Sequence, residues 1–426
     1  MLGDRSAPDS AAQARSRWSV LILAFGTFAI GTCEFVLAGL LPQLSASLDV
    51  TVPTAGQVVT VFALTCAVLA PVLATATAGL PRRRVLLAAA AIYLIGNAGT
   101  ALAPDFTVLL IAQMVAAAGA GLFIPTASVT ASALVAPEWR GRAIALVTTG
   151  LTAATALGAP IGTVLGGLFG WRSAVLFVAA LALLAMAGLA ALVPKNVNAP
   201  APETLRARLT PLADRRVVMI LVTTLLAFTA VYIPYTYISA VFAPATGGDS
   251  VRLAVLMSLV GIVGTLANYV AGSLADRIGS RRVVAGALVW LAAALLLIPL
   301  ATALYPAAVL MVVLYGFAAF AITAPQQHRL ITLKPESASV LISLNAAILY
   351  LGITMSGVLG GAGIVLVGAG KLTLIAAGIA LAALLMSELA HAAARRRAPR
   401  AGGESGEDGG EALERPEAPA PGPRPV

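Results

Sequence analysis

Apolar stretches of roughly 20 to 30 residues repeat along most of the chain, and each is long enough to cross a lipid bilayer. The first runs from Trp18 to Pro42, where an α-helix rises about 36 Å, against roughly 30 Å for the hydrocarbon core. Charged residues make up 11% of the 426 residues and hydrophobic ones 59%, whereas a soluble domain has about 25% charged residues. The sequence therefore predicts an all-α integral membrane protein.

The distribution of basic residues supports a count of twelve spans. If the N-terminus lies inside, 24 of the 27 Lys and Arg residues fall on the inner side, and only Arg172, Arg252 and Lys371 fall outside. Because positive charges in short loops favour the cytoplasmic side, we expect both termini to be cytoplasmic. The predicted spans are 18–42, 54–80, 84–103, 106–134, 141–168, 172–193, 215–243, 250–274, 282–303, 306–330, 337–361 and 370–391.

The two halves of the chain resemble each other. Arg83 and Arg281 each lie at the opening of a span, and Pro137 and Pro335 each lie in an inner loop, both pairs 198 residues apart. Two six-helix bundles related in this way are typical of secondary transporters built from parallel repeats. The predicted organisation is a disordered tail at 1–17, a bundle at 18–193, a Pro-rich linker at 194–214, a bundle at 215–392 and a disordered tail at 393–426.

Glu34 is the one carboxylate well inside a predicted span. A charge at this depth is costly unless it faces a cavity, has a partner or takes up a proton. Glu388 differs, because it lies near the inner end of the last span and can reach water. We interpret Glu34 as a functional group that binds and releases a proton; a side chain that snorkels or caps a neighbouring helix is the alternative.

Two motifs have the most distinctive spacing. One is Gly31-Thr-Cys-Glu34-Phe35 with Gly39-Leu-Leu-Pro42, and the other is Gly272-Ser-Leu-Ala-Asp276-Arg277-Ile-Gly279-Ser-Arg281-Arg282. Both are similar to signatures of the major facilitator superfamily. Within it, residues 18–392 resemble the twelve-helix drug:proton antiporters, especially bacterial chloramphenicol exporters and arabinose-efflux-type permeases. The resemblance implies the major facilitator fold, with two pseudo-symmetric bundles, and a proton-coupling role for Glu34.

The second motif implies a conformational lock on the inner side. Gly272 permits close helix contact and Gly279 a tight turn, and the Asp276 carboxylate is favoured near a helix N-terminus. We expect Asp276 to approach the start of the fifth span and to pair with Arg329 in one conformation. A solvated basic turn that only sets topology is the alternative. The predicted lock residues are Gly272, Asp276, Arg277, Gly279, Arg281 and Arg329.

Glycines recur at every fourth residue of the fifth span, at Gly158, Gly162 and Gly166. With Pro160 they resemble the antiporter motif of the family, which implies export. A glycine face lets another helix approach closely, and we expect the glycines of the eighth span to meet it. Pro160 removes a backbone hydrogen bond and should bend the helix. Ordinary helix packing is the alternative interpretation.

The predicted substrate cavity combines aromatic and amide side chains, which suit a neutral, partly aromatic compound. Gln113 stands where the family usually has an Arg, so it can hydrogen-bond a substrate or Glu34 but supplies no charge. Tyrosines can instead be anchors at the lipid interface, and Tyr237 fits that role best. The predicted cavity residues are Phe35, Gln113, Tyr232, Tyr235 and Asn345.

The leading functional prediction is proton-coupled efflux of small hydrophobic or weakly polar compounds, such as antibiotics, by alternating access. Efflux of a sugar or other metabolite on the same scaffold is the alternative. A membrane scaffold without transport activity is disfavoured, because it leaves the cost of Glu34 unexplained.

An enzyme is not expected. The only two histidines, His328 and His391, lie near span ends, so the sequence has no intramembrane cluster for catalysis. An ATP-driven pump is not expected either, because no phosphate-binding loop motif occurs. The predicted partners are a small-molecule substrate, protons and the lipid bilayer of a bacterial cell membrane. We expect no cofactor, metal or nucleic acid, and a monomeric protein.

Overall fold

The computed structural model describes residues 7–195, 197 and 210–396, and within them the chain forms helices and no strand. Twelve of the described helical segments are long and apolar enough to span a membrane, which confirms the all-α fold and the number of spans. The first half contains α1 (Ala7–Ser47), α2 (Val52–Ala76), α3 (Arg82–Ala101), α4 (Phe106–Ala133), α5 (Arg140–Ala153), α6 (Ala159–Phe169) and α7 (Trp171–Leu192).

The second half repeats this arrangement with more interruptions. It contains α9 (Arg215–Thr236), α10 (Ile238–Val241), α11 (Ala243–Thr246), α12 (Ser250–Ile278), α13 (Ser280–Ala301), α14 (Tyr305–Phe320), α15 (Thr323–Leu333), α16 (Ala338–Val367) and α17 (Leu372–Arg396). The predicted seventh span, 215–243, is shorter than expected, because α9 ends at Thr236 and short helices follow. Together α14 and α15 form the tenth span.

The predicted N-terminal tail is partly helical. Helix α1 begins at Ala7, so residues 7–17 extend the first span, where the sequence analysis expected disorder. The sequence offers Pro8 at the second helical position and several Ala, Arg and Gln residues, all of which suit a helix. At the other end α17 continues to Arg396. The remainder of both predicted tails, and most of the linker, lie outside the described residues.

The fifth span is irregular where the sequence places its proline. Residues Ala154–Gly158 form a π-helical turn between α5 and α6, directly before Pro160. A π-helical turn accommodates a local break in the helical hydrogen bonding. The fifth span is therefore irregular just before Pro160, and the bend at the proline itself stays a prediction.

The glycine face of this span packs against α1, not against the eighth span as predicted. A side chain at Gly158 would meet Thr32, one at Gly162 would meet Val36, and one at Gly166 would meet Leu40. The eighth span, α12, contacts the π-helical turn and α6 elsewhere. Glycines four residues apart lie on one face of a helix, but which helix packs against that face depends on the arrangement of the bundle.

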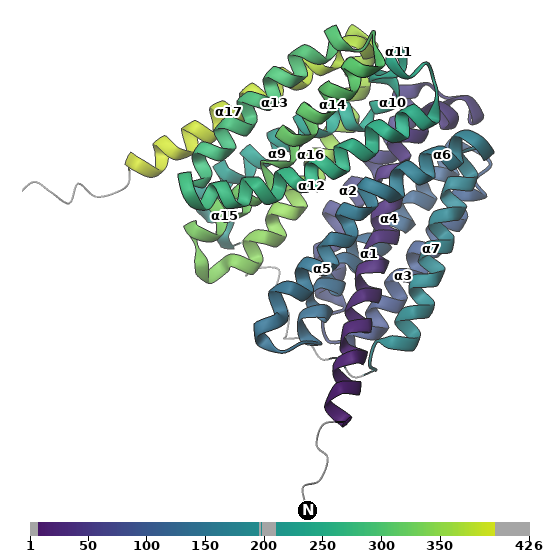
Figure 1. Ribbon diagram of the computed structural model, residues 1–426, viewed down its shortest axis with the longest axis vertical. Helices are drawn as coiled ribbons and strands as arrows, with labels where there is room; N and C mark the ends of the chain where they lie inside the picture. Colours follow the sequence, from purple (N-terminus) through teal and green to yellow (C-terminus); the bar gives the residue numbers. More distant parts are fainter. Residues whose placement is uncertain (1–6, 196, 198–209, 397–426) are drawn as a thin grey trace, which may run out of the picture.

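The two bundles meet at one end of the molecule and diverge toward the other (Figure 1). We call the end where α1 begins and α17 ends the termini face, and the opposite end the far face. At the far-face half, Gln57 Nε2 donates to the Gly357 carbonyl at 3.3 Å and Ser239 Oγ donates to the Ala38 carbonyl at 3.2 Å. Both bonds join the first bundle to the second.

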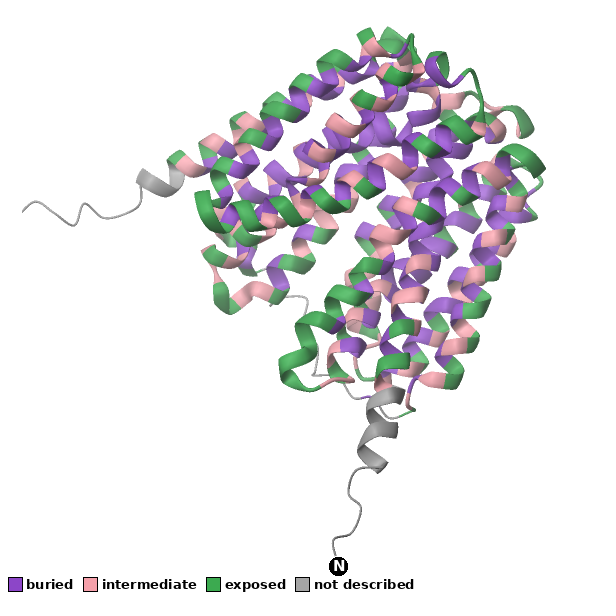
Figure 2. Ribbon diagram, in the orientation of Figure 1, coloured by how far each residue is buried: buried purple, intermediate pink, exposed green. Residues whose placement is uncertain are grey.

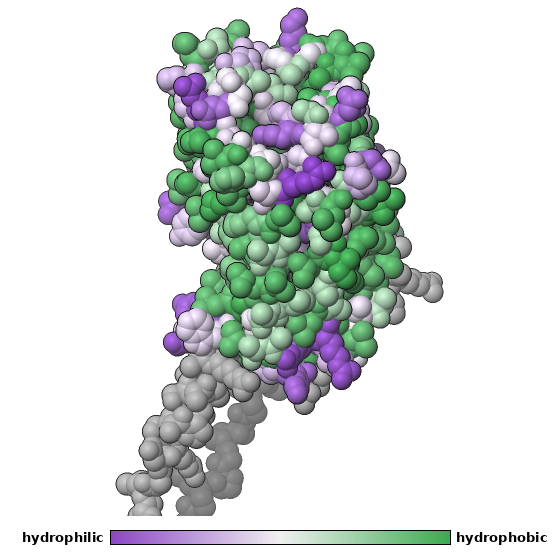
Figure 3. Space-filling model, turned by 90° about the vertical axis from the view of Figure 1, so that its right-hand side faces the viewer, coloured by the Kyte–Doolittle hydropathy of each residue, from purple (hydrophilic) through white to green (hydrophobic). Residues whose placement is uncertain are grey.

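The distribution of buried residues reflects the two-bundle arrangement. Buried residues are concentrated inside each bundle and where the bundles meet, while exposed residues follow the outer surfaces (Figure 2). Figure 3 shows that hydrophobic side chains cover much of the face that it displays, with hydrophilic residues gathered in patches. Large apolar side chains such as Leu184, Leu266 and Leu385 are exposed. Apolar outer surfaces of this kind suit contact with lipid.

Candidate functional site

The carboxylate of Glu34 lies where the two bundles meet. Glu34 is a half-buried residue of α1, in the first bundle. Its Oε2 accepts a hydrogen bond of 3.2 Å from the hydroxyl of Tyr350 in α16, in the second bundle. The one carboxylate deep in a span is thus bound to a side chain from the other half. Tyr350 was not among the predicted site residues, and nothing in its span, which also carries several Ser and Thr residues and Asn345, distinguishes it.

Aromatic rings surround this carboxylate. Phe35 and Tyr235 meet edge to face with ring centroids 5.9 Å apart, and Tyr232 meets Tyr235 in the same way at 5.9 Å. Phe228 extends the cluster, 6.3 Å from Tyr232. The structure therefore brings together three of the side chains that the sequence analysis grouped, and contacts of this geometry are favourable for aromatic pairs.

A small cavity lies between Glu34 and the aromatic cluster. Its volume is about 10 Å³, far below the roughly 300 to 1,000 Å³ of sites that hold drug-sized ligands. The hydroxyl of Tyr235 is buried and has no hydrogen-bond partner among the described residues. Residues that line the cavity are Glu34, Phe35, Ala38, Val59, Tyr232, Tyr235, Thr236 and Ile353.

Gln113 is not part of this cavity. Its side chain is fully buried in the first bundle, and Nε2 donates to Thr100 Oγ1 at 3.1 Å. Its Oε1 has no partner in the described part of the chain. Another buried polar contact in the same bundle joins Cys33 Sγ, as donor, to Asn97 Oδ1 at 3.2 Å. The face of α4 that carries Gln113 is turned toward α3, so this amide does not reach Glu34.

Asn345 also lies elsewhere, inside the second bundle. Its Oδ1 accepts a hydrogen bond from Thr224 Oγ1 at 3.0 Å, and Gln326 Nε2 donates to the same hydroxyl at 3.2 Å. Arg329 Nη1 in turn donates to Gln326 Oε1 at 3.2 Å. A chain of polar groups therefore connects Asn345 to Arg329. This connection is not evident from the sequence, because the residues come from three different helices.

The predicted lock residues are not paired as a lock in this conformation. Asp276 is exposed, and among the described residues no ion pair joins it to Arg329. Arg281 pairs with Glu388 instead, and Arg329 donates to Ser387 Oγ at 2.9 Å. Gly279 has a φ of 88°, which explains the glycine at that turn. Since the bundles diverge at the termini face, the Asp276 pair stays a prediction for the conformation in which that face is closed.

Tyr237 was expected to be an anchor at the lipid interface, and this prediction is wrong. Its side chain is fully buried at the far face, and the hydroxyl donates to the Gly357 carbonyl at 2.8 Å. The ring lies over Gly56, Gly360 and Gly361, where any side chain would collide with it. Tyr237 therefore helps to close the far face by packing between glycines from both bundles.

The chain matches proteins of one family over most of its length. Residues 23–357 match the model of the Major Facilitator Superfamily. Inner membrane transport protein YdhP of Escherichia coli (strain K12) is 34% identical over 376 residues, which cover 87% of this chain and 96% of YdhP. A chloramphenicol resistance protein of Streptomyces lividans is 40% identical over 141 residues, covering 33% of this chain and 36% of that protein.

A solved structure has the same fold. The crystal structure of a mutant of the nucleoside transporter NupG aligns with a TM-score of 0.71 at 14% sequence identity, covering 88% of this chain and 99% of the NupG chain. The family, the full-length relative and this structural neighbour are all transporters, so this chain is a transporter and not an enzyme. With its twelve spans and its inner-membrane relative, the chain is a multi-pass bacterial inner membrane protein that belongs to the Major Facilitator Superfamily.

Proposed function

We propose that this protein exports small hydrophobic or weakly polar compounds in exchange for protons, with Glu34 as the proton-binding group. The observation that carries the proposal is the hydrogen bond between Glu34 and Tyr350, which joins the two bundles beside an aromatic cavity. A carboxylate in this position interacts with the other bundle differently in its charged and neutral forms. Loss or gain of its proton can therefore bias the movement of one bundle against the other.

The lining of the cavity supports a hydrophobic substrate with at least one hydrogen-bond acceptor. Phe35, Tyr232 and Tyr235 offer ring faces and edges, and the Tyr235 hydroxyl is a donor without a partner among the described residues. The cavity is smaller than a drug-sized site, so a substrate enters only after the bundles move apart. The partial similarity to a chloramphenicol resistance protein agrees with a compound of this class.

Efflux of a polar metabolite is the second candidate. The structural similarity to a nucleoside transporter favours it, although that likeness concerns the fold. A polar metabolite needs several hydrogen-bond partners at its site, whereas the cavity is lined mainly by aromatic and aliphatic side chains. We therefore favour the hydrophobic substrate.

We also propose that the termini face is cytoplasmic, from the 24 to 3 distribution of basic residues. In that orientation the two bundles diverge toward the cytoplasm (Figure 1), the side from which an exporter takes up its substrate. Fluorescence of a green fluorescent protein fused to the C-terminus tests the orientation, because that protein fluoresces in the cytoplasm. Alkaline phosphatase, which is active only in the periplasm, should be inactive when it is fused at the same point.

Proton flux in energised inverted membrane vesicles tests the function. A pH-sensitive dye reports the gradient while uncharged drugs, cationic drugs and nucleosides are added in turn. One class should collapse the gradient in wild type and in Glu138→Gln, a matched change at an exposed carboxylate, but not in Glu34→Gln. Substrate movement without proton flux in wild type would refute coupling. If nucleosides were the only class that collapsed the gradient, efflux of a polar metabolite would be the function.

A further inference from the structure

A second group of charged side chains lies at the termini face of the second bundle, apart from Glu34 and its cavity. Arg216 at the start of α9, Arg281 at the start of α13 and Arg329 in α15 line one pocket of about 370 Å³. His328 and His391 line the same pocket. The pocket therefore brings together cationic or potentially cationic groups from four helices, α9, α13, α15 and α17.

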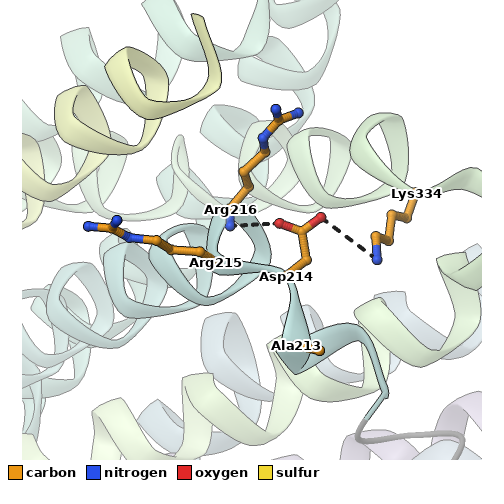
Figure 4. Close-up of a pocket in the computed structure, with 5 residues that line it drawn as sticks. All are labelled: Ala213, Asp214, Arg215, Arg216 and Lys334. Carbon is orange, nitrogen blue, oxygen red and sulfur yellow. Dashed lines mark hydrogen bonds and ion pairs between the residues drawn. The ribbon is translucent and has the colours of Figure 1, made fainter. Parts of the chain in front are cut away.

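Carboxylates neutralise this group only in part. Glu388 pairs with Arg281. Asp214, the nearest carboxylate to Arg216 along the chain, is engaged elsewhere: it accepts a hydrogen bond of 2.9 Å from the backbone nitrogen of Arg216 and lies 3.7 Å from Lys334 Nζ. Figure 4 shows the Arg216 guanidinium extending away from Asp214. Among the described residues, Arg216 has no ion pair.

Among the described residues, the hydrogen bonds of Arg329 go to neutral groups. Its Nη1 donates to Gln326 Oε1 at 3.2 Å and to Ser387 Oγ at 2.9 Å, and it has no ion pair in the described part of the chain. Its side chain is half-buried. Three guanidinium groups thus share a single paired carboxylate, and the pocket carries an excess of positive charge.

We propose that this pocket binds a phosphate group, either that of an anionic phospholipid or that of a soluble phosphate compound. Guanidinium groups present pairs of N–H donors that match two oxygens of a phosphate, and clustered Arg residues are its usual partners. The hydroxyl of Ser280 also lines the pocket and can serve as a further donor after rotation.

The position of the pocket suits such a ligand. Helices α9 and α13 begin there and α15 and α17 end there, so the pocket lies at the level where membrane spans meet the headgroup region. Basic pockets between membrane helices at this level bind phospholipid headgroups. A bound phosphate would bridge helices that belong to the same bundle and would stabilise that end of it.

Native mass spectrometry of the purified full chain in detergent tests the proposal. Phosphatidylglycerol is the probe for an anionic lipid phosphate, and phosphatidylcholine, whose headgroup has no net charge, is the comparison. In a separate arm, isothermal titration calorimetry with inorganic phosphate tests a soluble ligand. Arg216→Gln and Arg329→Gln should each weaken binding about tenfold, since each removes a charge-assisted hydrogen-bond donor.

Arg215→Gln is the matched control. It removes the same charge from the neighbouring residue, which does not line this pocket and whose side chain points in another direction (Figure 4). It should bind like wild type, and thermal melting of all variants checks that each is folded. Specific binding of phosphatidylglycerol identifies the lipid source, and binding of inorganic phosphate alone identifies the soluble source.

Two outcomes overturn the proposal. One is that wild type binds neither probe more tightly than Arg216→Gln and Arg329→Gln do. The other is that Arg215→Gln weakens binding as much as Arg216→Gln, because the attraction is then a property of the whole basic rim. Neither result depends on which compound the protein transports, since the readout is binding to the purified chain.

Discussion

Tyr350 donates a hydrogen bond of 3.2 Å to Oε2 of Glu34, and this contact joins α16 to α1 across the boundary between the two bundles. Hydrogen bonds from Gln57 to Gly357 and from Ser239 to Ala38 are further bridges between the bundles. A hydrogen bond to a charged group is worth about 1.5 to 3 kcal/mol. The contact can therefore change the balance between conformations by a factor of roughly ten or more.

We predict that Tyr350→Phe shifts this balance toward the conformation that is open at the far face. The ring remains, but the donor to Glu34 is lost, so the closed far face loses one bond between the bundles. Electron–electron distance measurements between spin labels on α2 and α16 would report the shift as a larger population of long distances. An unchanged distance distribution would show that the bond does not contribute to closure.

Tyr235→Phe should weaken the apparent affinity for the substrate without lowering the stability of the protein. The Tyr235 hydroxyl has no partner among the described residues, so its removal leaves no protein group unsatisfied. Transport of a substrate that accepts a hydrogen bond should show a KM raised about tenfold, consistent with loss of one such bond. Purified protein should melt at the wild-type temperature or slightly above it.

Tyr315→Phe is the control for that variant. The Tyr315 hydroxyl donates to the Val231 carbonyl inside the second bundle. Its loss should lower stability by about 1 kcal/mol and leave KM unchanged. If both variants lower the melting temperature equally, the Tyr235 hydroxyl has a protein partner in solution.

Gly261→Ala should prevent the bundles from meeting normally. An added Cβ would lie 2.5 Å from the backbone nitrogen of Ala156 and 2.6 Å from its Cα, and backbone atoms cannot rotate away. Because Gly261 belongs to α12 and Ala156 to the fifth span, the variant forces the halves apart. We expect a lower melting temperature and transport reduced by at least about tenfold, because backbone displacement disturbs the whole interface.

Gly286→Ala makes the same chemical change at an exposed glycine of α13 that has nothing within 4 Å of the added carbon. It should keep full transport and gain up to about 1 kcal/mol of stability, from the higher helix propensity of Ala. Equal loss of transport in both variants would contradict the assignment of Gly261 as an interface contact.

The capping carboxylate at the start of α12 predicts a pH effect. Asp249 accepts hydrogen bonds from the backbone nitrogens of Arg252 at 3.1 Å and Val251 at 2.7 Å, and these bonds hold the pKa of Asp249 below its usual range. The folded state therefore favours the charged form. Its stabilising effect is present at neutral pH and is lost as the pH falls through the folded-state pKa.

Asp249→Ala should accordingly lower the melting temperature near neutral pH, and the difference from wild type should shrink in strongly acidic buffer. Glu138→Ala, which removes an exposed carboxylate elsewhere in the described chain, is the matched control. If the difference in melting temperature between Asp249→Ala and wild type did not change with pH, the charge of Asp249 would not contribute to the stability of the helix cap.

The sequence alone determined the twelve spans and the family, because both depend on properties carried by short stretches of chain. Transfer of an apolar run into lipid is favourable whatever its neighbours are, so composition over about 20 residues is sufficient. The same local reasoning identified Glu34 as an unusual charge. It also grouped Tyr232 with Tyr235, which meet in the structure because three residues along a helix return to one face.

Only the tertiary structure decided which residues meet across helices. Gly158, Gly162 and Gly166 share a face, but their neighbour is α1 and not the eighth span. Gln113 turns toward Thr100, Asn345 toward Thr224, and Tyr237 into a glycine-lined contact and not toward lipid. In these helices nearly every side is apolar, so the hydrophobic pattern does not specify the rotation of a helix about its axis. Close packing between particular side chains sets that rotation, and with it the partner of Glu34.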